Sequence, residues 1–211
     1  MQEATLKEKA YVKLREWLMN GHFTPGEFLT ERNLVEKLEM SRTPIRAALE
    51  RLEAEGHVSY TPNKGIFVKE LSIDKVIHFY DFRIAIESFV AKKLAGLSLS
   101  SEQIAWFEDN LSRQKSCVDN RDYALFTTID SEFHLGLANL YGNLEIVQTM
   151  ERLQDRLYQI ALKVLQKDIT RIQISYENHL NIFKFITNGD ADGASTEMTQ
   201  HLEYGKRILL F

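Results

Sequence analysis

The sequence lacks the features that mark secreted and membrane-embedded proteins. Cys117 is the only cysteine among 211 residues, so a framework of internal disulfides is excluded and a reducing compartment is indicated. We interpret Cys117 as a small core residue. No apolar run approaches the ~18 residues that cross a bilayer, and the charged N-terminal segment has no apolar stretch typical of a signal peptide. We therefore expect a cytoplasmic protein with no membrane partner.

Proline is scarce, and the chain has no excess of positive charge. None of the three prolines follows Pro62, as uninterrupted helices over the remaining chain would require. Residues 1–70 hold 11 Lys and Arg against 11 Asp and Glu, and residues 71–211 hold 15 against 19. Neither half indicates nucleic-acid binding by its net charge, so a DNA-binding surface must concentrate its cations locally.

The first 70 residues predict three helices followed by a β-hairpin. Apolar residues recur at three- and four-residue spacings in 5–20, 31–38 and 41–55. After Gly56 the period changes to two, on both sides of a turn at 61–65. Three helices and a small hairpin in this order predict a winged helix-turn-helix domain over 1–70.

The residues from 71 onward predict helices alone. We place these helices near 73–96, 100–118, 122–140, 143–165, 169–188 and 190–209. The predicted fold class is mainly α, with a second, all-α domain over 71–211. Because the junction near 69–72 is short, we expect the two domains to be coupled rather than loosely tethered.

Two arginines mark the third helix as a DNA-recognition helix. Arg42 and Arg46 are four residues apart near its N-terminus and project from one face. A recognition helix presents such residues to the major groove, where arginine can bond guanine. Thr43 beside them could meet a phosphate or a thymine methyl group. The alternative is that Arg42 and Arg46 lie on an ordinary solvated helix face. The helix, its cap, the preceding turn and the wing all occur here together, which favours DNA recognition.

Further DNA contacts are predicted outside the third helix. Arg32 on the second helix could reach the DNA backbone or a base edge. Asn63, Lys64 and Gly65 at the hairpin tip suit the narrow minor groove, where a glycine permits close approach of the backbone.

Residues 21–68 resemble the DNA-binding domain of the GntR family of bacterial regulators. The matching motifs are PGEFL at 25–29, SRTPIR at 41–46, LEAEG at 52–56 and TPNKGIFV at 61–68. The resemblance implies a homodimer on a short palindromic operator of double-stranded DNA. It also implies DNA contacts by Arg32, Arg42, Thr43, Arg46, Asn63, Lys64 and Gly65. Ala47 departs from the Glu that many members carry.

Four polar residues of the second domain fall on inward helix faces. Asp130 and His134 share one face, and His179 and His201 each lie in an apolar stripe of a later helix. Buried polar groups need partners, and one divalent metal would satisfy all four. Three imidazoles and a carboxylate suit zinc, nickel, iron(II) or manganese. The alternative is that each histidine is hydrogen-bonded separately, in the core or at the surface.

Residues 73–209 resemble the FCD ligand-binding domain of the FadR subgroup, a bundle of six or seven helices. The matching stretches are DSEFH at 130–134, His179, NGD at 188–190 and MTQHL at 198–202. The resemblance implies a divalent metal at Asp130, His134, His179 and His201 but not which one; among zinc, nickel, iron and manganese we expect zinc. It also implies a small carboxylate effector that completes the metal shell.

Arg83 is our candidate for the counter-charge of that effector. It lies in an apolar helix, and the subgroup commonly has Arg-x-x-x-Glu here, matched by Arg83 and Glu87. An internal ion pair between these two residues is an equally open interpretation. His78 is expected at the surface or at the domain junction.

The predicted function is a DNA-binding transcription regulator controlled by a small carboxylate at the metal site. We assign no catalytic residues and expect no enzyme. One alternative is a metal-dependent hydrolase, because such a site could activate water. The sequence, however, lacks a nucleophile elbow, a phosphate loop and a His-Glu-x-x-His motif. The other alternative is a metal-free sensor of acyl-CoA esters, against which the filled ligand set argues.

Overall fold

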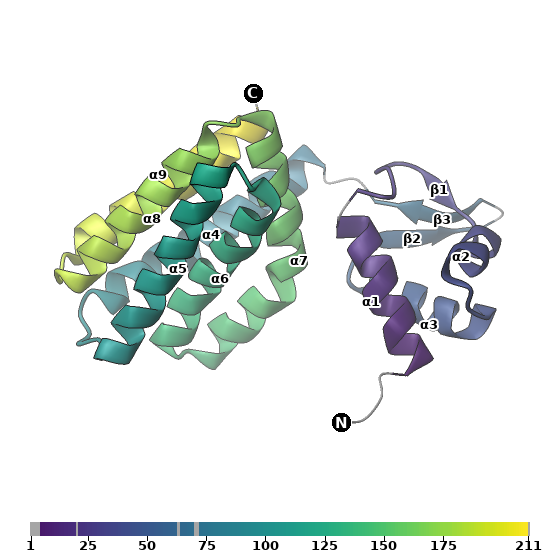
Figure 1. The fold of residues 1–211 in the computed structure, drawn as a ribbon, viewed down its shortest axis with the longest axis horizontal. Helices are drawn as coiled ribbons and strands as arrows, with labels where there is room; N and C mark the ends of the chain where they lie inside the picture. The colour runs from purple at the N-terminus through teal and green to yellow at the C-terminus, as the bar shows by residue number, and fades with distance from the viewer. Residues whose placement is uncertain (1–4, 20, 63, 70–71, 211) are drawn as a thin grey trace. The chain divides into compact units, whose positions relative to one another are not determined.

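The computed structural model describes residues 5–19, 21–62, 64–69 and 72–210. The chain forms two compact units, Met1–Leu71 and Ser72–Phe211 (Figure 1). They divide one residue beyond the boundary expected from the sequence. Helices dominate the described residues and a small antiparallel sheet lies in the first unit, which confirms the predicted mainly α fold class.

The first unit combines helices with a small sheet. Its elements are α1 (Leu6–Met19), β1 (Phe28–Leu29), α2 (Glu31–Leu38), α3 (Arg42–Ala54), β2 (Val58–Thr61) and β3 (Gly65–Val68). The strands are antiparallel in the order β1-β3-β2. The predicted helices and hairpin are confirmed, whereas strand β1 was not predicted. Two residues are too few to show a period of two in the sequence.

Helix caps and one apolar core position α3 in the first unit. Thr30 begins α2 by accepting a hydrogen bond from the backbone N–H of Asn33 at 3.2 Å. Ser41 occupies the cap position of α3 as predicted, but its hydroxyl accepts no capping bond. Fully buried side chains, each worth roughly 1.5–3 kcal/mol, include Leu14, Leu34, Ile45 and Leu52.

Gly65 is required where the wing hairpin meets β1. Its φ of +98° lies in the left-handed region that favours glycine. A Cβ at this position would collide with the carbonyl oxygen of Leu29. The sheet therefore requires glycine here even without DNA. Asn63, which was predicted to act with it, lies outside the described residues.

The second unit is all helical in its described part. Its elements are α4 (Ile73–Leu94), α5 (Ser101–Asn120), α6 (Tyr123–Tyr141), α7 (Leu144–Lys167), α8 (Arg171–Thr187) and α9 (Ala191–Leu210). Each of the six predicted helices is present within about two residues. The predicted capping box is also present: Ser100 accepts from Gln103 N at 3.2 Å, and Ser100 N donates to Gln103 Oε1 at 2.8 Å.

Helix α4 is the central element of this bundle. It packs along α9 and also contacts α6 and α8 (Figure 1). Helix α6 in turn packs against both α5 and α7. Helices α6, α8 and α9 thereby surround the same interior, although α6 precedes α8 by the whole of α7. None of the described helices is long and apolar enough to cross a membrane.

Candidate metal centre and candidate DNA-binding surface

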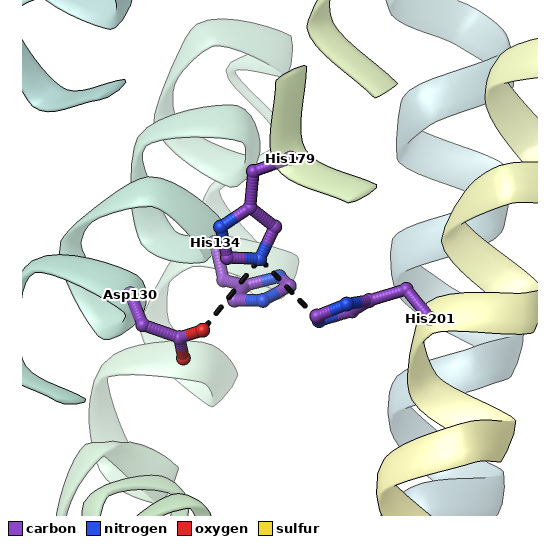
Figure 2. A group of neighbouring side chains, drawn as sticks. All are labelled: Asp130, His134, His179 and His201. Carbon is purple, nitrogen blue, oxygen red and sulfur yellow. Dashed lines mark hydrogen bonds and ion pairs between the residues drawn. The ribbon is translucent and has the colours of Figure 1, made fainter. Parts of the chain in front are cut away.

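Four predicted ligands meet in the interior of the second unit. Asp130 and His134 come from α6, His179 from α8 and His201 from α9, and all four are buried. One ligand atom from each lies within 4.8 Å of the others. Figure 2 shows the carboxylate and the three rings turned toward a common point. The helical periodicity of the sequence predicted that these four side chains point inward, and the fold brings them together.

The contacts within this four-residue cluster are close. His179 Nε2 lies 3.3 Å from His201 Nε2 and 3.6 Å from Asp130 Oδ1 (Figure 2). The ring of His179 stacks on Phe133, with centroids 4.4 Å apart and planes 17° from parallel. Phe133 is fully buried, so the stack restricts the rotation of His179.

A chain of hydrogen bonds fixes which nitrogen of His179 is protonated. The Ile129 carbonyl can only accept, so the Asn110 amide donates to it at 3.1 Å. Asn110 Oδ1 then accepts from Gln114 Nε2 at 2.8 Å. Gln114 Oε1 therefore accepts from His179 Nδ1, also at 2.8 Å. The proton on Nδ1 leaves the lone pair of Nε2 facing the cluster, which is the arrangement of a metal-ligating histidine.

His134 contributes a buried nitrogen that has no hydrogen-bond partner among the described residues. Its Nδ1 lies 2.5 Å from Glu87 Oε2, an ion-pair distance, although the ring is not aligned for a regular hydrogen bond. Its Nε2 is buried and has no partner. Because buried polar atoms are rarely left unsatisfied, this nitrogen indicates that a group belongs at the centre of the cluster.

Arg83 is held by Glu87 in the structure. Its Nε donates to Glu87 Oε1 at 2.5 Å and its Nη2 to Glu87 Oε2 at 3.3 Å, with both side chains 5% exposed. The ion pair that the sequence left open is therefore present. The guanidinium still lines the cavity beside the cluster, and Glu87 connects it to His134.

Burial keeps the imidazoles of His179 and His201 in their neutral form. It lowers the pKa of His179 and of His201 well below 6.5, and the neighbouring positive groups add to the effect. Burial likewise raises the pKa of Asp130, an effect that His134 and the buried guanidinium groups oppose. Burial is the largest influence on Glu87 and would raise its pKa, but Arg83 and His134 together lower it to about 2.

The donor set fits a divalent metal. Neutral imidazoles and a carboxylate are the ligands of zinc and of first-row transition ions. The lone pair of His179 Nε2 faces the cluster, 3.3 Å from His201 Nε2, and His134 Nε2 has no partner among the described residues, so both nitrogens lie where such an ion would bind.

The interpretation of the sequence missed Arg171. This residue begins α8 and is 2% exposed, and its Nη2 lies 3.0 Å from His201 Nδ1 and 2.8 Å from the His201 carbonyl oxygen. A signal existed, because Arg171, Ser175 and His179 follow each other at four-residue spacing and so share a helix face. Gln114 gave no comparable signal, since its role depends on a contact between helices.

The predicted residues on the helices of the first unit are exposed. Arg42, Thr43 and Arg46 lie on the outer face of α3, and Arg32 is exposed on α2. Arg46 Nε contacts Glu31 Oε1 at 2.8 Å, and Arg32 Nε contacts Glu36 Oε1 at 3.0 Å. Arg42 has no carboxylate partner within the described part of the chain.

The wing tip also carries an exposed cation. Lys64 is exposed, and its ammonium group lies 5.8 Å from the ring centre of Phe28. Elsewhere, His78 is exposed and Cys117 is buried, as expected.

Both units match protein families. Residues 6–68 match the bacterial regulatory proteins of the gntR family, and residues 78–204 match the FCD domain. A winged helix-turn-helix followed by an FCD bundle defines a class of DNA-binding transcription regulators. The chain belongs to the GntR family, and its FCD domain fits the FadR subgroup.

Curated relatives and solved structures span nearly the whole chain. The Nta operon transcriptional regulator of Aminobacter aminovorans is 30% identical over 182 residues, which are 86% of this chain and 84% of that protein. The HTH-type transcriptional repressor RspR of Escherichia coli is 25% identical over 198 residues, 94% and 86% of the two chains. The structure of E. coli McbR/YncC superposes with a TM-score of 0.78 at 21% identity, covering 99% of this chain and 98% of that one. This last similarity shows the fold alone.

Proposed function

We propose that this GntR-family regulator responds to a small carboxylate through a divalent metal held by Asp130, His134, His179 and His201. The observation that carries the proposal is the cluster itself: four buried ligand atoms within 4.8 Å of one another. When bound, the metal supplies a positive charge that attracts an anion into the interior. The residues around the cluster orient the ligands and exclude water.

The N3O donor set favours zinc. Zinc accepts imidazole and carboxylate in tetrahedral geometry, and it retains an open position when fewer protein ligands bind. Nickel, iron(II) and manganese accept the same donors. Elemental analysis of the purified protein distinguishes them.

We propose that the exposed residues of α3, α2 and the wing contact DNA. Arg42, Thr43 and Arg46 would enter the major groove of each half-site, and two copies of the chain would bind a short palindrome. The proposal also includes Arg32, Asn63, Lys64 and Gly65. The exposure of α3 and its packing on a rigid core support it, since a recognition helix must be both accessible and fixed.

The alternatives have less support. The cavity beside the cluster measures about 30 Å³, far too little for a long acyl chain. A hydrolase needs a general base near the metal. Glu87, a carboxylate that contacts the cluster through His134, is occupied by Arg83 and His134. The relatives are named as regulators, a class that is generally not enzymatic.

A mobility-shift assay tests the proposed function. Zinc-loaded protein should retard duplex DNA from upstream of its own gene at moderate salt, and acetate should change the affinity by about 5- to 150-fold. The His134→Ala variant should still bind DNA without responding to acetate. The proposal fails if retardation is merely salt-sensitive and sequence-independent. It also fails if His134→Ala responds as the parent does.

A further inference from the structure

Arg46 on α3 is held by a carboxylate from a different helix. Its Nε donates to Glu31 Oε1 at 2.8 Å, and this bond joins α3 to the first residue of α2. The Arg46 side chain is 60% exposed, whereas that of Glu31 is 25% exposed. Exposed ion pairs contribute little to stability, so the main effect of this pair is on the conformation of Arg46.

Glu31 is anchored by the core of the first unit. The Thr30 hydroxyl caps α2 directly before it, accepting from Asn33 N at 3.2 Å. Leu34 follows within one turn of the helix and is fully buried. The backbone of Glu31 is therefore fixed on both sides, and its carboxylate gives Arg46 a fixed point of attachment.

The neighbouring pair of Arg32 and Glu36 is not anchored in this way. Arg32 Nε lies 3.0 Å from Glu36 Oε1, but the two side chains are 85% and 65% exposed and both belong to α2. Because both lie largely in solvent, this pair restricts neither side chain as Glu31 restricts Arg46.

The hydrogen bond to Nε leaves the end of the Arg46 guanidinium free. A guanidinium has five N–H donors, one on Nε and two on each terminal nitrogen. Glu31 uses the first, and Nη1 and Nη2 make no hydrogen bond to any described residue. Guanine presents two acceptors, O6 and N7, in the major groove. The pair of terminal nitrogens matches this pair of acceptors.

We propose that Glu31 is a positioning residue for DNA recognition, which holds Arg46 by Nε so that its two terminal nitrogens meet one guanine of each half-site. This inference rests on the proposed function, in which α3 enters the major groove. Holding the arginine before binding lowers the conformational entropy that binding would otherwise cost. Removing Glu31 should therefore weaken recognition of one base pair rather than binding to all sequences.

Glu50 provides a matched control within the described part of α3. It is exposed, lies one turn beyond Arg46, and lines the same cavity as Glu31. The hydrogen bond and the charge of Glu31 raise the pKa of Arg46 most, and Glu50 adds to this effect through its charge alone. Glu50→Ala thus removes an equal charge near the arginine without removing a hydrogen bond.

Selection of duplexes from a random pool by the full-length protein, read by sequencing, tests the role of Glu31. Arg46→Ala should lower discrimination at one base pair of each half-site by roughly 5- to 150-fold, the loss of one arginine–guanine contact. Glu31→Ala should lose roughly 5-fold or more at the same base pair and keep the parent's preference elsewhere. Glu31→Gln retains an acceptor oxygen, so its profile should lie closer to that of the parent than to that of Glu31→Ala. Glu50→Ala should match the parent.

The outcomes separate this role from the proposed function. A Glu31→Ala profile equal to the parent's, an even loss at every base pair, or an equal loss in Glu50→Ala would overturn the positioning role. If calorimetry shows that Glu31→Ala is less stable, Glu31→Leu, which fills the space without an acceptor, decides in its place. If Arg46→Ala keeps the parent's profile, Glu31 has no base contact to position, and the inference fails while the other DNA contacts stand. A parent protein that enriches no sequence defeats the proposed function itself.

Discussion

Gln114 accepts a hydrogen bond from His179 Nδ1 at 2.8 Å and thereby directs His179 Nε2 to the centre of the cluster. Replacing Gln114 with Leu removes this acceptor, and metal affinity should fall about 10- to 100-fold. Competition with a chromophoric chelator measures the change. Gln114→Glu is the matched variant, because it keeps an acceptor for Nδ1, and it should retain affinity better than Gln114→Leu. Equal affinities in the two variants would contradict the role of Gln114.

Removing the metal should destabilise the protein. A metal present at 1,000 times its Kd stabilises the native state by about 4 kcal/mol, which for a chain of this size corresponds to roughly 10 °C in Tm. Chelation should produce such a drop, measured by differential scanning calorimetry. His179→Ala and His201→Ala should melt at the same temperature with and without chelator. The exposed His78→Ala control should keep the full drop.

Glu87 should make stability depend on pH in the acid range. Its pKa in the folded protein is about 2, below the unfolded value of about 4.5, so its contribution is complete above 4.5 and is lost as pH falls toward 2. Glu87→Gln should cost about 3–5 kcal/mol near neutral pH, because it leaves Arg83 buried without its partner. Urea unfolding between pH 7 and 3 should show that the difference in free energy of unfolding between the parent and Glu87→Gln becomes smaller as the pH falls.

Asp81→Asn is the matched control for Glu87 on the same helix. Asp81 pairs with Lys206 at 2.6 Å, but its side chain is 55% exposed. Such a surface pair contributes about 0–1 kcal/mol. A loss in Asp81→Asn as large as in Glu87→Gln would show that the effect is not specific to the buried pair.

Arg42 and Arg46 should be needed for specific DNA binding. Each arginine that bonds a guanine contributes about 1–3 kcal/mol of discrimination, so the double alanine variant should lose roughly 2–6 kcal/mol of affinity for its operator. Fluorescence anisotropy with a labelled operator measures this loss. Arg113→Ala, which removes an exposed arginine of α5 paired with Glu132, should leave affinity unchanged. An unaffected double variant would defeat the assignment of α3 as the recognition helix.

Local spacing in the sequence predicted the helices and placed the four cluster side chains on inward helix faces, and the resemblance to the FCD domain implied that they act together as metal ligands. Asp130 and His134 are one turn apart, and helical period alone places them on one inward face. Contacts between different helices or strands could not be predicted from spacing along the chain. The period of α4 gives Arg83 and Glu87 a shared face, but only the packing of α4 against α6 shows that Glu87 also meets His134. The Glu31–Arg46 pair likewise joins two helices across a turn.

The arrangement of α6, α8 and α9 around one point has a consequence for internal motion. The ligands at 134, 179 and 201 lie far apart along the chain, so an ion bound to them would act as a cross-link closing two long loops. Local opening of α8 or α9 would then require breaking this cross-link. Amide hydrogen exchange in these two helices should slow when zinc is added, while exchange in α1–α3 should report whether that rigidity reaches the DNA-binding unit.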